Sequence, residues 1–129
     1  MSTTEGSEPP RPAVNPGIRA GLTGEVELTI GSEHLAPHVP KFCTPAMLFL
    51  IEQGCYRAVV SLLYPGQTVV GYQFNIRHLA SAGIGDRVTT RCTLTDVTYN
   101  RLEFSAQVQR DDTILGTAQL YLAVVEQAS

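Results

Sequence analysis

The most apolar run of the chain lies near its middle, at residues 46–51, and a carboxylate, Glu52, follows it directly. A Thr-Pro pair precedes the run, and a Tyr-Pro-Gly sequence ends the segment. We interpret Thr44 as the N-cap of a helix and Pro45 as its first residue, where the missing N–H has no cost. The Pro-Gly pair indicates a turn. The pattern predicts one helix over residues 45–63, about 28 Å long at 1.5 Å per residue.

Glu52 points away from the polar side of this helix. At about 100° per residue, three polar residues form one stripe, and Glu52 lies roughly 140° from its centre. Burial raises the pKa of a carboxylate unless a cation or hydrogen-bond donors compensate, and such a group in a cleft is a candidate general acid, base or nucleophile. The alternative is a carboxylate at a helix edge or in a structural pair. The stripe consists of Gln53, Arg57 and Ser61.

Apolar and polar residues alternate over residues 71–78, which predicts a half-buried strand. The alternation places Tyr72 and Phe74 on the apolar face, which ends at His78. His78 and Glu52 meet if this strand lies under the helix. A single histidine at the end of an apolar face also occurs as a hydrogen-bonded packing residue, so the strand alone leaves both interpretations open.

The remaining segments predict a meander of strands around the helix. One alternating run precedes the helix, and four follow it, separated by short turns that favour antiparallel pairing. One strand, one long apolar helix and a meander make an α+β fold, in which a curved antiparallel sheet wraps the helix as in the hot-dog arrangement. Such a sheet leaves its edges open, so we expect a homodimer or a dimer of dimers. The runs are residues 25–30, 67–79, 87–97, 100–110 and 113–125.

Composition narrows the class of protein. Residues 1–20 hold four of the eight prolines, so we expect a disordered tail there and one folded domain over residues 21–129. The net charge of −3 argues against nucleic-acid binding. Without a bilayer-spanning stretch or a signal peptide, we expect no membrane partner and a cytoplasmic location. The three cysteines, His34 and His38 lack metal-ligand spacing, so we expect no metal and no cofactor.

The sequence Phe-Cys-Thr-Pro-Ala-Met-Leu-Phe-Leu-Ile-Glu, which ends at Glu52, resembles the start of the helix in hot-dog thioesterases of the fluoroacetyl-CoA thioesterase type. The strand that ends at His78 and the later Gly-Ile-Gly-Asp sequence are similar to that family too, and the resemblance covers roughly residues 24–125. It implies an active site of Thr44, Glu52 and His78. The fluoroacetyl-specific member carries an arginine where this chain has Leu120. The resemblance therefore implies a thioesterase that acts on a small or medium acyl-CoA, and the departure at Leu120 puts fluoroacetyl specificity in doubt.

Hydrolysis of a thioester needs a nucleophile or an activated water, together with donors for the oxyanion. The resemblance and the chemistry agree on Glu52 as nucleophile or general base, and they make His78 a hydrogen-bonding group or a proton shuttle. Thr44 would bind the carbonyl oxygen at the helix N-terminus or orient Glu52. Its alternative role is that of an N-cap alone.

Two further sets of residues are candidates for binding the substrate. Large apolar residues near the implied site would line the acyl pocket, although their pattern also fits a plain core: Phe42, Met47, Tyr72 and Phe74. Arginines would meet the phosphates of coenzyme A. Arg87 and Arg91 share one face of a strand, and the favoured alternative is that this face is exposed to solvent and does not bind coenzyme A. The arginines are Arg77, Arg87 and Arg91.

Two other functions are compatible with the same pattern. A hot-dog hydratase or dehydratase would act on an enoyl thioester, but the chain lacks the Asp-and-His pair at the spacing that such enzymes use. A non-catalytic module for acyl-CoA or another small ligand would use Glu52 and His78 structurally, and its ligand would raise the melting temperature without being consumed.

Overall fold

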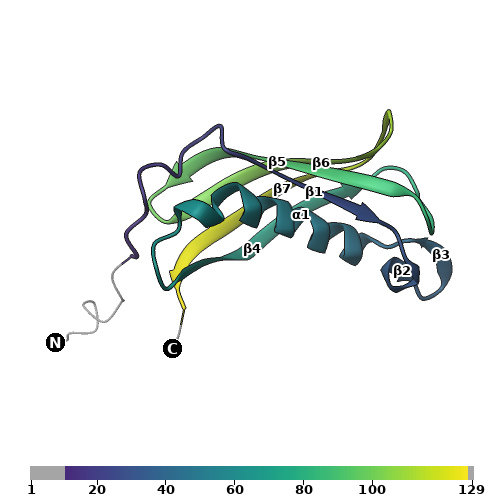
Figure 1. Ribbon diagram of the computed structural model, residues 1–129, viewed down its shortest axis with the longest axis horizontal. Helices are drawn as coiled ribbons and strands as arrows, with labels where there is room; N and C mark the ends of the chain where they lie inside the picture. The colour runs from purple at the N-terminus through teal and green to yellow at the C-terminus, as the bar shows by residue number, and fades with distance from the viewer. Residues whose placement is uncertain (1–10, 128–129) are drawn as a thin grey trace.

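The structure is a computed structural model that describes residues 11–127. One long helix, α1, lies against an antiparallel sheet, with a small hairpin beside the start of the helix (Figure 1). The elements in chain order are β1 (Thr23–Thr29), the 3-10 helix η2 (Ser32–His34), β2 (Leu35–Ala36), β3 (Val39–Phe42), α1 (Thr44–Val59), the 3-10 helix η3 (Val60–Leu62), β4 (Gln67–His78), β5 (Arg87–Thr98), β6 (Arg101–Arg110) and β7 (Thr113–Glu126).

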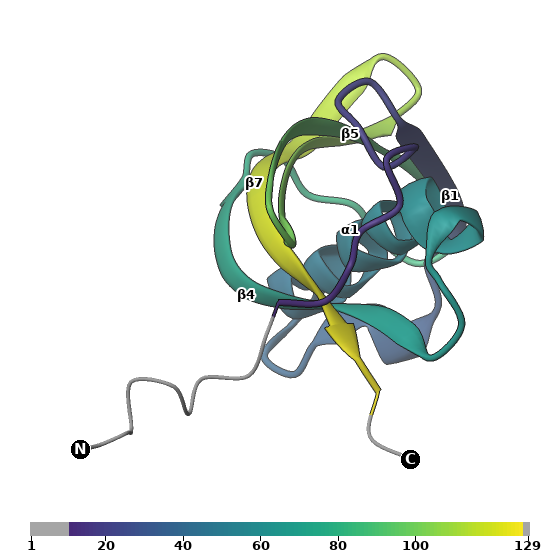
Figure 2. The same ribbon diagram turned by 90° about the vertical axis from the view of Figure 1, so that its left-hand side faces the viewer.

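The main sheet has the strand order β1-β5-β6-β7-β4, and every neighbouring pair is antiparallel. It curls around α1 from β1 on one side to β4 on the other (Figure 2). The hot-dog prediction is confirmed, and helix and strands lie within a few residues of their expected bounds. Both β1 and β4 are edge strands, and β4 is the longer of the two.

The helix packs on β1 and β5, and Ile51 and Cys55, four residues apart in α1, are buried and lie beside Cys92 of β5. Two glycines allow the backbones to approach closely. A Cβ on Gly24 of β1 would lie 2.0 Å from the carbonyl oxygen of Gly54 in α1. Because β1 and β5 hold this side of the helix so tightly, the opposite side of α1 faces β4 across a more open space.

The segment before β1 is ordered from residue 11 onward, so the expected disordered tail is wrong for residues 11–20, and residues 1–10 lie outside the described part. Ile18 is buried, and the Gln67 side chain donates a hydrogen bond to the Ala13 carbonyl at 2.6 Å. The segment crosses one end of the molecule beside the end of α1 (Figure 2). Burial of the Ile18 side chain stabilises this segment against the core, although its proline-rich composition suggests disorder.

A β-bulge in β4 changes the face on which Tyr72 lies. Gly71 pairs with Leu122 and Gln73 with Tyr121, so Tyr72 is the extra residue. Its ring lies beside the ring of Tyr121 on the outer face of the sheet, with centroids 6.4 Å apart. The predicted alternation is therefore wrong for Tyr72, since a bulge shifts the side chains that follow by one residue.

Candidate active site

Glu52 extends from the third turn of α1 toward β4 and is half-buried. Its carboxylate reaches the backbone of Gly71, where an added Cβ would lie 2.9 Å from Glu52 Oε2. Among residues 11–127, no side chain donates a hydrogen bond to this carboxylate or forms an ion pair with it. Burial therefore raises the pKa of Glu52 above its ordinary value of 4.5 without a compensating charge.

The space that Gly71 leaves empty holds Phe74 as well as Glu52. The same added Cβ would lie 2.4 Å from Phe74 Cζ, so the aromatic ring stands over the glycine and beside the carboxylate. Phe74 stays on the inner face because it pairs with the buried Leu120 of β7. The ring shields one side of the carboxylate from water, which agrees with the raised pKa.

An open groove of about 710 Å³ runs between α1 and β4 above this carboxylate. Its walls are largely apolar, with the exposed residues Phe49, Tyr56 and Val70 among them, and Gln53 and Arg57 also line it. The cation nearest along the helix, Arg57, donates instead to the Glu25 carbonyl of β1 at 3.2 Å. The groove thus offers an apolar channel with one uncompensated carboxylate in its wall, suited to a ligand with an apolar part and a reactive polar group.

Thr44 and His78 meet at the other end of the helix. The Thr44 hydroxyl and His78 Nδ1 are 2.8 Å apart. The helix begins at Thr44, its N-cap is Cys43, and no side chain caps it. The interpretation of Thr44 as the N-cap is therefore wrong, and Pro45 is the second helical residue. The hydroxyl is available for the imidazole because it does not bond the helix backbone.

Two of the expected pocket residues surround this pair from the core. The ring of Phe42 meets that of His78 edge-on, with centroids 6.3 Å apart. Met47 is fully buried, and its sulfur fills the space beside Gly116, the residue that pairs with His78. Phe42 contacts the imidazole, Met47 packs beside the residue that pairs with it, and both are almost fully buried, so neither lines the groove.

The structure brings Thr44 together with His78 but keeps Glu52 apart from both within one chain. Thr44 and Glu52 are eight residues apart in α1, about 12 Å along the axis at 1.5 Å per residue. Glu52 reaches β4 at Gly71, whereas His78 lies seven residues further on, roughly 20 Å along a bulged strand at about 3.3 Å per residue. Within one chain, the Thr44–His78 pair and the Glu52 carboxylate therefore lie at separate places along the helix.

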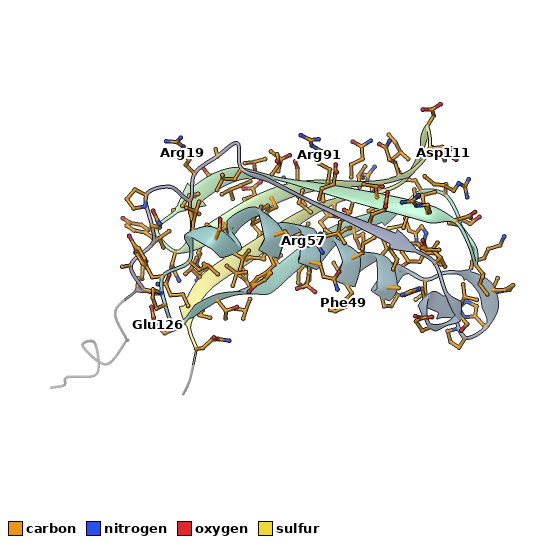
Figure 3. All side chains as sticks on the ribbon, in the orientation of Figure 1. Arg19, Phe49, Arg57, Arg91, Asp111 and Glu126 are labelled. Carbon is orange, nitrogen blue, oxygen red and sulfur yellow. The ribbon has the colours of Figure 1, made fainter. Side chains whose placement is uncertain are left out.

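The three arginines lie on the outer face of the sheet, which is turned away from Glu52. Arg87 forms an ion pair with Glu27, and Arg91 Nη1 lies 3.8 Å from Glu25 Oε2. Figure 3 shows Arg91 on the side of the sheet opposite to the helix. Their strand alternates these arginines with buried residues that pack on α1, which supports a solvated face for Arg87 and Arg91. Arg77 lines a separate polar hollow on the same outer face.

The sequence did not identify Gly71 or Phe49 as parts of the site. Gly71 contributes by having no side chain, which leaves space for Glu52 and Phe74. The alternation of apolar and polar residues does not show where such a space is needed. Phe49 belongs to an apolar run whose residues are all expected in the core, yet its side chain is 62% exposed. The only available signal was the length of that run, which exceeds one helix face.

Two further features of residues 11–127 concern ligands and membranes. No three His, Cys, Asp or Glu side chains of this part are grouped so that they would hold a metal ion. Nor does this part include a helix with the length and hydropathy needed to cross a membrane.

Comparison with known proteins gives consistent results. A sequence model of the fluoroacetyl-CoA-specific thioesterase family matches residues 25–128. A structure of the thioesterase FlK of that specificity shares 24% identity, covers 85% of this chain and 90% of its own, and superposes with a TM-score of 0.79. A thioesterase superfamily member from Thermus thermophilus has 20% identity, 85% coverage of both chains and a TM-score of 0.81.

A hot-dog-like protein from Thermanaerovibrio acidaminovorans, 21% identical with 83% coverage of both chains, superposes with a TM-score of 0.78. No curated protein sequence matches the chain. The structural likenesses establish the fold, and the sequence model covers most of the chain.

Proposed function

Because the chain belongs to the fluoroacetyl-CoA-specific thioesterase family and is a thioester hydrolase, we propose that it cleaves acyl-CoA at a site made of Glu52, His78 and Thr44. The observation that carries this assignment is the unpaired, half-buried Glu52 carboxylate in the wall of an apolar groove. Solved complexes of the relative FlK contain CoA with fluoroacetate in one case and acetyl-CoA in another. They support coenzyme A as the carrier.

The raised pKa suits Glu52 to its role. A carboxylate is a better base when its pKa lies closer to the working pH. In the simplest route, water attacks the thioester carbonyl and gives its proton to Glu52. The tetrahedral intermediate then expels the CoA sulfur, which receives that proton and leaves as the thiol. Attack by the carboxylate itself, through an acyl-enzyme anhydride that water opens, uses the same residue.

His78 and Thr44 would act on the oxygen or sulfur of the reacting group. When the Thr44 hydroxyl donates to Nδ1, the neutral imidazole carries its proton on Nε2. That N–H is then a fixed donor, either for the oxyanion or for the departing sulfur. The hydrogen bond from Thr44 would thus orient the imidazole of His78, which makes Thr44 a positioning residue.

A homodimer would complete the site. The free edge of β4 offers unpaired backbone groups, and this strand carries exposed apolar side chains such as Val70 and Tyr72. Two β4 strands paired about a two-fold axis, with Gly71 opposite the partner subunit's His78, would bring Glu52 to the imidazole of the other chain. Each dimer would then have two composite sites.

Mixing two inactive variants tests this arrangement. We expect Glu52→Ala and His78→Ala each to lower kcat/KM for acyl-CoA by at least about a hundredfold, measured by release of free thiol. After unfolding and refolding together, half of the dimers carry one copy of each variant and have one intact site. Activity should then return to about a quarter of the wild-type value. No recovery in a mixed dimer would place the site within one chain.

A separate control addresses the reaction itself. Sedimentation shows whether the variants remain dimeric, and circular dichroism shows whether they fold. If folded wild-type protein releases no thiol from acyl-CoA esters with acyl groups of any length, the proposed substrate is wrong. Loss of enoyl absorbance from crotonyl-CoA without thiol release would indicate a hydratase instead.

A further inference from the structure

A second cavity of about 480 Å³ lies beside the first half of α1. Phe49 and Gln53 line both this cavity and the groove that contains Glu52, so the two spaces adjoin at these side chains. Apolar residues form most of its remaining wall, including Leu28 of β1 and Ala46 and Leu50 of α1. An apolar space of this size is within the range of ligand pockets.

Phe49 stands between the two spaces. Its side chain is 62% exposed, and it points outward from the helix on the side away from the sheet (Figure 3). Among the described residues, the core offers no packing role that explains an exposed aromatic ring at this position. Contiguous exposed apolar patches mark ligand-binding grooves, and Phe49 lines the groove together with two other exposed apolar residues, Tyr56 and Val70.

We propose that Phe49 determines the acyl specificity of the enzyme and that the second cavity takes the acyl tail. This inference rests on the proposed function, because it places the thioester carbonyl at Glu52. Ala46 lies six residues before Glu52, about 9 Å along the helix axis. A chain that spans this distance past Phe49 has roughly six to eight carbons, given carbon–carbon bonds of about 1.5 Å.

The lining also selects the chemistry of the tail. Leucine, alanine and phenylalanine side chains favour a hydrocarbon, because burying a carboxylate at the end of an acyl group would cost free energy that no lysine or arginine of this wall offsets. The substrate class is therefore a medium-chain, uncharged acyl thioester. A two-carbon acyl group would not reach the second cavity, so it would gain nothing from these contacts.

Binding of two stable analogues to the wild-type protein tests the proposal without any turnover. S-octyl-CoA and S-ethyl-CoA are thioethers that the enzyme does not hydrolyse, and calorimetry measures the affinity for each. Burial of added methylene groups should strengthen binding by about fourfold each until the cavity is full. Equal affinity for the two analogues, or no binding of either, would overturn the proposal.

Two variants locate the effect. Ala46→Phe fills the second cavity and should lower the ratio of kcat/KM for octanoyl-CoA to that for acetyl-CoA at least tenfold. Phe49→Ala widens the passage and should raise the ratio of phenylacetyl-CoA to octanoyl-CoA. The matched control, Ile84→Ala, removes an exposed apolar side chain that lines neither space and should leave both ratios unchanged.

The results separate this inference from the proposed function. Thiol release with ratios that none of the variants changes would leave the thioesterase in place and remove the role of Phe49. Chain-length-dependent binding of the thioethers, without hydrolysis of any acyl-CoA, would keep the acyl cavity and remove the proposed reaction.

Discussion

Gly71→Ala is the substitution that most directly tests the geometry of the site. The new Cβ would lie 2.4 Å from Phe74 Cζ and 2.9 Å from Glu52 Oε2, whereas ordinary contacts begin near 3.4 Å. The ring must therefore move by 1.0 Å (3.4 less 2.4) and the carboxylate by 0.5 Å (3.4 less 2.9). A displacement of about 1 Å can lower a rate by about a hundredfold, so the smaller shift of the reacting carboxylate should lower it by about tenfold, which corresponds to about 1.4 kcal/mol in the activation free energy.

The same substitution should affect stability much less. Gly71 does not have a positive φ, so alanine introduces no backbone strain, and Phe74 is partly exposed and has room to turn. Gly66→Ala is the matched control. Gly66 has a φ of 84° and nothing within 4 Å of an added Cβ, so alanine there should cost about 1 kcal/mol of stability without touching the site.

Thiol release from acyl-CoA and thermal unfolding of both variants provide the readouts. We expect Gly71→Ala to lose most of kcat at a nearly unchanged melting temperature. Gly66→Ala should keep kcat and have a lower melting temperature. The double variant Gly71→Ala, Phe74→Ala should recover part of the rate, because removal of the ring gives the carboxylate space to return. The account of the site fails if Gly71→Ala hydrolyses acyl-CoA within about threefold of the wild-type rate.

Three further predictions follow from other contacts. Burial raises the pKa of Glu52 above 4.5, so the native state holds this proton more tightly than the unfolded chain does. The resulting stabilisation is complete below pH 4.5 and is lost as the pH rises through the native pKa. Urea unfolding of the Glu52→Gln variant should lack this pH dependence. Thr44→Val should lower kcat while leaving the melting temperature nearly unchanged, since the hydroxyl bonds His78 and does not cap the helix. Thr44→Ser, which keeps the hydroxyl, should restore the rate. A large loss of stability in Thr44→Val would instead show that Thr44 caps the helix. Gly24→Ala should destabilise the fold by about 3 kcal/mol in urea unfolding, because the new Cβ meets the backbone of Gly54, which cannot turn aside.

The fold was predictable because the spacing of apolar residues depends on which face each element buries. The run before Glu52 gave the helix, and alternation gave the strands, each within a few residues of the structure. The irregular features were not predictable in the same way. A bulge at Tyr72 leaves no mark on composition, and the buried Ile18 lies among prolines that suggest disorder.

The candidate residues were easier to find than their arrangement. Glu52 was conspicuous because a carboxylate is costly among apolar neighbours, and His78 because it ends an apolar face. Their spacing in the sequence does not show that Thr44 meets His78 while Glu52 reaches Gly71 instead. The arginines show the same limit. Alternation correctly placed Arg87 and Arg91 on one face, but only the packing of their neighbours on α1 shows that this face points away from the helix.

The bulge and the glycine at its start depend on one another. Without the extra residue, strict alternation from Phe74 would place residue 72 inward and Gly71 outward, so a tyrosine side chain would occupy the position beside Glu52. The bulge moves that ring to the outer face and brings Gly71, which has no side chain, under the carboxylate. A strand edge is a common place for bulges that redirect side chains next to active sites. In this chain the irregularity opens the room in which a half-buried acid and an aromatic ring lie together, and the proposed substrate carbonyl would lie beside them.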